Sequence, residues 1–184
     1  IAACSETIVL DSSASVPAMQ LLSPPLDAGQ ALQIGSHEIT ALLTALKNFE
    51  ISWVIDLPRT VDCELVSTLD LLNRIVLVLE PTVPALACAG RWFDIFQDLG
   101  YGPDRVLCLL NRSGGKMRDI ESQLAANLRG YPLLRLPNAY EAAERACIDG
   151  LPLCVQAPRS AYAKAMQDLA RAVNSTTTTT TTAS

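Results

Sequence analysis

SWVIDLPR, at residues 52–59, is an apolar run that ends in an aspartate and a proline. A second run, IVLVL at residues 75–79, follows it and ends in Glu80 and another proline. Strands buried on both faces of a parallel sheet read as continuous Val, Ile and Leu rather than as alternating polar and apolar residues. In open parallel sheets ligands bind at the carboxyl ends of the strands, so Asp56 and Glu80 stand where binding residues are expected.

Helical and strand patterns alternate along the rest of the chain. Helical stripes end in glycines at positions 100, 130 and 150, which is typical of helix C-termini. We expect strands at 19–22, 53–56, 75–79, 106–110 and 133–136, and helices at 36–46 (capped by Ser36), 61–72, 85–99, 117–128, 140–148 and after Ser160. Strands that alternate with helices of this length form right-handed crossovers. The sequence therefore predicts an α/β fold with a mainly parallel, doubly wound sheet covered on both faces.

Composition excludes several classes of protein. The 184 residues are 49% hydrophobic, enough for a core without metal or disulfide support, and they carry a net charge of -5. The chain lacks a cluster of Lys and Arg, so we expect no nucleic-acid partner. Its longest apolar runs are strand-sized, so we expect no membrane insertion. Residues 174–184 include seven successive threonines, which predicts a disordered tail.

Metal and disulfide chemistry have little support in the pattern. The six cysteines lack a C-x-x-C pair, and most lie in apolar segments, so we expect small buried thiols of a reducing compartment, with the cytoplasm as the default. His37 is the single histidine and has no partner at metal spacing, so we expect a solvated residue in the first turn of its helix.

Two polar positions at strand ends have a chemical interpretation and a structural one. A carboxylate at Asp56 suits a Mg²⁺-bound water beside a phosphate, but Asp also caps helices. Asn111 and Arg112 suit the edge and the face of a purine, but both are ordinary at the end of a strand. The stretch SGGK at 113–116 fails the G-x-x-x-x-G-K-[ST] pattern, so we interpret it as a loop and helix start.

Four strand-end motifs occur in an order that resembles the ParA/MinD-like P-loop ATPases. They are DLPR at 56–59, LEPT at 79–82, LLNR at 109–112 and LPN at 136–138. The pattern is most similar to the CpaE/TadZ branch, the pilus-assembly localisation proteins of the Flp/Tad system. The resemblance covers residues 19–173 as an ATPase-fold domain and leaves residues 1–18 as an N-terminal remnant.

The resemblance implies a cytoplasmic protein that binds ATP and Mg²⁺ and forms a homodimer around the nucleotide. It also implies contacts with the pilus and secretion machinery, which the protein helps to place at a cell pole. Two alternatives stay open: an active ParA/MinD-type ATPase for partitioning or septum positioning, and an unrelated small-molecule enzyme. The last predicts a sizeable apolar pocket near Glu80 or Asn111.

Site residues follow from the same resemblance. Asp56 matches the catalytic Walker B-like aspartate, which holds Mg²⁺ through water. Asn111 and Arg112 match the pair that contacts adenine. Pro137 and Asn138 match the segment that approaches the base, although many relatives have Asp at the second position.

Arg59 and Glu80 are further candidates at strand ends. Either residue faces nucleotide or a partner, or the two pair with each other or with solvent.

One departure from the family concerns the phosphates. The lysine-bearing phosphate loop of the family, normally on the first strand of the fold, has no counterpart here, so we expect an incomplete fold that lacks the Walker A strand. Without its lysine and backbone donors, this chain alone is expected to bind ATP poorly. Whether the complete protein hydrolyses ATP stays open.

Overall fold

The computed structural model describes residues 22, 27, 29, 33–49, 52–57, 62–114 and 118–175. The chain divides into two compact units, Ile1–Leu72 and Asn73–Ser184, and each is described by itself. The expected strand at 19–22, apart from Leu22, and most of the threonine tail lie outside the described residues.

In the first unit, helices α2 (Ser36–Leu46) and α3 (Cys63–Leu71) pack on each other. The cap of α2 is Gly35 rather than the expected Ser36, because the Glu38 carboxylate accepts a hydrogen bond from the Gly35 N–H at 3.0 Å. Asp62 caps α3 by accepting from Leu65 N–H at 2.7 Å. Asp56 therefore does not cap this helix.

The expected strand at 53–56 is wrong. Residues 52–57 carry no strand, and Val54 is 99% exposed. A strand exists only where its backbone N–H and C=O groups find a neighbouring strand, and the ladders among the described residues join only β1, β2 and β3. The apolar pattern of residues 53–55 is therefore insufficient to form a strand without a neighbouring strand.

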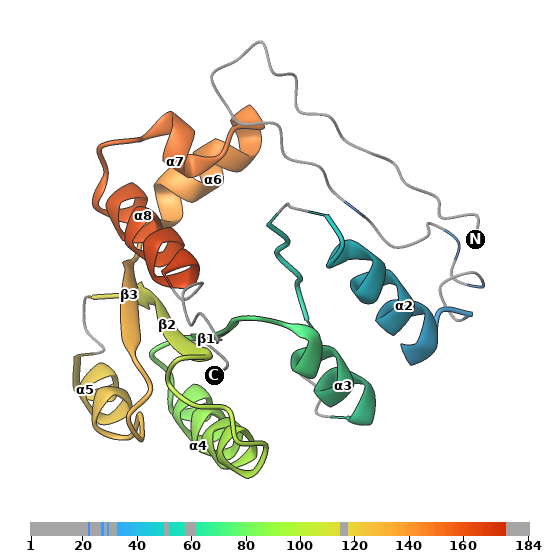
Figure 1. Cartoon of the computed structure of the whole chain (residues 1–184). Coiled ribbons are helices and arrows are strands. Elements are labelled where there is room, and N and C mark those ends of the chain that lie inside the picture. Colours follow the sequence, from blue (N-terminus) through green and yellow to red (C-terminus); the bar gives the residue numbers. More distant parts are fainter. Residues whose placement is uncertain are drawn as a thin grey trace, which may run out of the picture. The chain divides into compact units, whose positions relative to one another are not determined.

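The second unit confirms the expected alternation of strands and helices (Figure 1). Its elements are β1 (Ile75–Leu79), α4 (Val83–Asp98), β2 (Val106–Ser113), α5 (Arg118–Ala126), β3 (Leu133–Pro137), α6 (Tyr140–Asp149), α7 (Leu153–Gln156) and α8 (Ala161–Asn174). The sheet has the order β1-β2-β3, and both pairings are parallel. The short helix α7 was not expected, and β2 is three residues longer than the apolar run that predicted it.

The core of this unit surrounds β2. Its residues Val106, Cys108 and Leu110 are fully buried, and the two residues between them are almost as buried. Because neighbouring side chains of a strand point to opposite faces, the sheet is covered on both faces at β2. Helices α4 and α5 pack against each other, and α8 packs on β3 (Figure 1).

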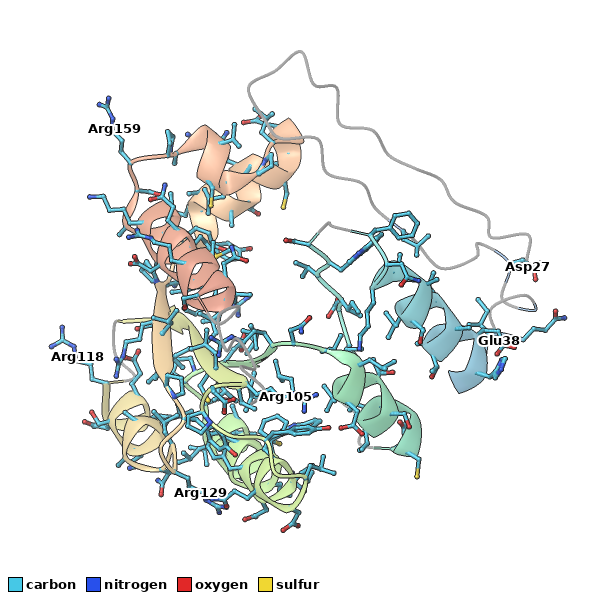
Figure 2. The ribbon with its side chains drawn as sticks, in the orientation of Figure 1. Asp27, Glu38, Arg105, Arg118, Arg129 and Arg159 are labelled. Carbon is cyan, nitrogen blue, oxygen red and sulfur yellow. The ribbon has the colours of Figure 1, made fainter. Side chains whose placement is uncertain are left out.

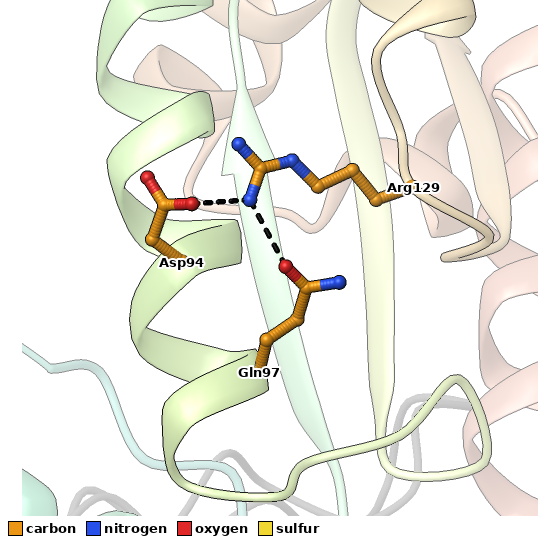
Figure 3. A network of polar contacts seen from close by, with 3 residues as sticks. All are labelled: Asp94, Gln97 and Arg129. Atoms are coloured by element: carbon orange, nitrogen blue, oxygen red, sulfur yellow. Dashed lines mark hydrogen bonds and ion pairs between the residues drawn. The ribbon is translucent and has the colours of Figure 1, made fainter.

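A polar network ties α4 to the turn that follows α5 (Figure 3). The Arg129 guanidinium donates to Asp94, with which it also forms an ion pair, and to Gln97 Oε1 at 3.0 Å. Charged side chains also lie on the outside of the unit, as Arg118 and Arg159 show in Figure 2. None of the helices among the described residues has the length and apolarity needed to cross a membrane.

Candidate functional site at the carboxyl edge of the sheet

The carboxyl ends of β1, β2 and β3 meet at one edge of the sheet because all three strands are parallel. Leu79 pairs with Leu110, so Glu80 and Asn111 are the next residues of neighbouring strands. Ser113 pairs with Pro137. We call Glu80, Asn111, Arg112, Pro137 and Asn138 the base rim. The structure thus brings together five of the seven residues singled out in the sequence.

A bulge lies in β2 at the base rim. Leu110 pairs with Arg135 and Ser113 with Pro137, so two residues of β2, Asn111 and Arg112, stand opposite one residue of β3. Bulges of this kind redirect side chains and are frequent beside active sites. Sequence patterns gave no sign of this one.

Arg112 adopts a left-handed backbone, with φ at 53°. This conformation costs a non-glycine residue about 1–3 kcal/mol and persists only where neighbouring contacts hold it. One contact is local: the Asn111 Oδ1 accepts a hydrogen bond from the Arg112 N–H at 3.0 Å. The Asn111 amide is therefore oriented with its NH₂ group away from the backbone.

Arg112 also forms an ion pair across the two strands. Its Nη1 lies 3.4 Å from Glu80 Oε1, and the side chains are 57% and 46% exposed. At this exposure the pair contributes at most about 1 kcal/mol to stability. Glu80 thus pairs with Arg112. Arg59, the partner considered in the sequence analysis, lies outside the described residues.

Glu121 of α5 holds the turn after the bulge, a role that the sequence did not predict. The residue is 9% exposed, and its carboxylate accepts from Gly114 N–H at 2.6 Å and from Ser113 Oγ at 3.4 Å. Gly114 has φ at 105°, where a side chain would be strained. The sequence offered one signal for this role, which is an acidic residue in the first helical turn after a glycine-rich loop.

The end of β3 lies against the same turn. Asn138 N–H donates to the Ser113 carbonyl at 3.1 Å, which holds the Pro137–Asn138 segment beside the bulge. The Asn138 side chain is exposed and Pro137 is half-buried. The Pro137–Asn138 segment therefore lies at the same edge of the sheet as Asn111.

Asp56 belongs to the first unit, whereas the base rim belongs to the second. Its side chain is exposed and forms no hydrogen bond or ion pair with a described residue. An exposed carboxylate of this kind is an oxygen ligand that Mg²⁺ accepts, together with water and phosphate oxygens. Its role as the Walker B-like residue stays a prediction.

Metal ligation and the cysteines can be compared with the expectations from the sequence among the residues that the structure describes. They contain no group of three His, Cys, Asp or Glu residues able to hold a metal ion. His37 is solvated as expected and lies 3.8 Å from the Glu38 carboxylate. Five cysteines lie among the described residues as free thiols, and of these only Cys108 is buried. The expectation of buried thiols is wrong for three exposed helix positions, Cys63, Cys88 and Cys147.

The described residues of the second unit line at least two cavities. One of about 210 Å³ lies between α4 and α5, beside Phe93 and Leu124, and one of about 370 Å³ lies between α6 and α7, beside Arg145 and Gln156. Neither is lined by Glu80 or Asn111. Neither cavity is therefore the apolar pocket near Glu80 or Asn111 that a small-molecule enzyme would need.

Three solved structures share this fold. A ParA family ATPase from Chlorobium tepidum superposes with a TM-score of 0.69 at 21% identity, over 84% of this chain. The cell division ATPase MinD of Pyrococcus furiosus gives 0.66 at 21% identity over 85% of the chain. The septum site-determining protein MinD of Pyrococcus horikoshii, complexed with Mg-ADP, gives 0.66 at 18% identity over 84%.

The chain spans 64%, 65% and 63% of the length of these three structures, in the same order. No protein-family model and no curated protein matches the sequence. At these identities the similarity establishes the fold, which is the P-loop NTPase-like α/β fold of the ParA and MinD ATPases.

Proposed function

We propose that this chain is part of a ParA/MinD-type ATP-binding protein and that its base rim binds the adenine of the nucleotide. One observation carries the proposal. The β2 bulge holds Asn111 and Arg112 beside the Pro137–Asn138 segment, which is bonded to Ser113 at 3.1 Å. A ligand at this edge meets an amide, a planar cation and an apolar ring within a few residues, a combination that suits a purine.

Asp56, in the first unit, is the residue that we propose to hold Mg²⁺ through water in the ATP-bound protein. Mg²⁺ is usually held by one or two carboxylates together with water and substrate phosphates, so one exposed carboxylate suffices from the protein. Bound Mg²⁺ supplies charge neutralisation at the phosphates. The support from a neighbour is that the Pyrococcus horikoshii MinD structure contains Mg-ADP.

At the cellular level, the proposed role is that of a CpaE/TadZ-like homodimeric scaffold that localises the Flp/Tad pilus assembly machinery in the cytoplasm, at a cell pole. Support for this finer role comes from the four strand-end motifs in the sequence. A second candidate is a switching ATPase for partitioning or septum positioning. The fold that the chain shares with a ParA family ATPase and with MinD favours this alternative.

Nucleotide binding is tested by calorimetry with Mg-ATP on the wild type, on Asn111→Ala and on a matched control, Asn127→Ala. Asn127 is an exposed asparagine after α5, and its side-chain amide donates to the Gln123 carbonyl at 2.8 Å. We expect millimolar binding that Asn111→Ala weakens about tenfold, which corresponds to one hydrogen bond, and that the control preserves. Equal affinity of Asn111→Ala and wild type contradicts the proposed adenine contact.

The cellular role is tested by expressing a fluorescent fusion in the native host. A scaffold of the pilus machinery gives a polar focus that Asn111→Ala disperses. A focus at mid-cell, or nucleoid-bound patterns with rapid ATP turnover by the complete protein, supports the switching ATPase instead.

A further inference from the structure

We propose, on the basis of the adenine site above, that Glu80 makes the base rim selective for 6-aminopurines over 6-oxopurines. It does so in two ways. Its carboxylate accepts a hydrogen bond from the amino group of the base, and it neutralises Arg112, which would otherwise favour the oxo group. The groups involved are the Glu80–Arg112 ion pair and the Asn111 amide, which lie side by side at the bulge.

Glu80 and Asn111 are adjacent across two parallel strands. They follow the paired residues Leu79 and Leu110, and neighbouring strands lie about 4.8 Å apart. One residue offers a hydrogen-bond donor and the other an acceptor. The Asn111 Oδ1 is engaged by the Arg112 N–H at 3.0 Å, which leaves the amide NH₂ as a donor. One oxygen of Glu80 lies 3.4 Å from Arg112, which leaves the other as an acceptor.

This donor beside an acceptor is complementary to an adenine edge. Adenine presents its N6 amino donor next to the N7 acceptor, so Glu80 receives the amino hydrogen while Asn111 donates to the ring nitrogen. A 6-oxopurine presents two acceptors, O6 and N7, on the same edge. Its O6 would face the Glu80 carboxylate without a hydrogen between them, which is repulsive.

Arg112 favours the 6-oxopurine instead. The guanidinium fork is complementary to O6 and N7 of a 6-oxopurine, and this is the commonest specific arginine contact with a base. In the structure Glu80 engages one end of that fork, and the 57% exposure of the Arg112 side chain leaves it able to move when Glu80 is removed. Selectivity is therefore the difference between two opposed contacts at one position.

Adenosine and inosine test the proposal because they differ only at the C6 substituent and in the proton that inosine carries on N1, and neither carries a phosphate. Dissociation constants of both nucleosides are measured by NMR titration of the ¹⁵N-labelled chain. We expect the wild type to prefer adenosine by about tenfold, within the range that a site built on such hydrogen bonds achieves. Glu80→Gln should bring the ratio close to one, because an amide both accepts and donates.

Two further variants separate the contributions. Arg112→Gly suits the observed φ of 53° and removes the guanidinium, so the preference for adenosine should persist or increase. Asp98→Asn removes one carboxylate at the far end of α4, away from the base rim, and should leave the ratio unchanged.

Equal binding of the two nucleosides by the wild type, or an unchanged preference in Glu80→Gln, overturns the role of Glu80. Adenine binding at the base rim would still stand in either case, since Asn111 would still respond to the nucleoside. Absence of any nucleoside-dependent shift at the base rim overturns the adenine site and this proposal together.

Discussion

Cys108 should make the folded chain sensitive to alkaline pH. It lies in the middle of β2, paired with Leu77 on one side and Leu133 on the other, and it is fully buried. Burial raises the pKa of its thiol to about 12. In an unfolded chain a cysteine thiol loses its proton near pH 8.5. The unfolded state thus loses a proton at a pH where the folded state retains it.

This difference sets both the sign and the size of the effect. The raised folded pKa contributes stability that is fully present below the unfolded pKa and is lost as the pH rises toward the folded value. Each pH unit in that window lowers the free energy of unfolding by about 1.4 kcal/mol. Two units above the unfolded pKa therefore remove roughly 2–3 kcal/mol, a large part of the stability of a small domain.

Urea unfolding at a series of pH values measures this loss for the wild type, Cys108→Ala and the exposed control Cys147→Ala. At neutral pH Cys108→Ala is less stable than the wild type because it leaves a small cavity. As the pH rises, the wild type and the control lose stability while Cys108→Ala loses less, so the curves converge. Parallel curves for the wild type and Cys108→Ala would refute the reasoning, because the thiol would then be solvated and β2 would not be the central strand.

Three other changes test the packing of the two units by urea unfolding. Leu110→Ala removes a fully buried side chain from β2 and should cost about 2–5 kcal/mol, whereas a loss under about 1 kcal/mol would mean a poorly packed core. Arg74→Met removes hydrogen bonds to the Asp104 carbonyl and, at 3.1 Å, to the Ala172 carbonyl near the end of α8, so we expect a loss of about 1–3 kcal/mol and greater proteolysis of α8. Asp62→Ala removes the cap of α3 and should cost about 1 kcal/mol, which Asp62→Asn should largely restore.

Much of the second unit was predictable from the sequence because its signals are local. IVLVL and VLCLL are unbroken apolar runs, and glycines with positive φ follow α4 and α6 as the pattern required. The strand predicted at 53–56 failed for a non-local reason. Residues 53–55 are apolar like those of β1, but a strand also needs a hydrogen-bonding neighbour, which a sequence window does not contain.

Within the candidate site, the sequence located the residues but not their arrangement. The position of Asn111 near the carboxyl edge of the sheet was predictable, because it directly follows the apolar run and parallel strands share their carboxyl edge. The bulge was not, since it depends on the register between β2 and β3. For the same reason the Glu80–Arg112 pair and the support from Glu121 became visible only in the fold.

A crystal structure of the chain with ADP and Mg²⁺ at millimolar concentration tests the central claim most directly. The adenine site predicts that the base lies against Asn111 and Arg112 on one side and Pro137 and Asn138 on the other, with its amino group toward Glu80. A base bound in the cavity between α4 and α5, or anywhere away from the carboxyl edge of the sheet, would contradict it.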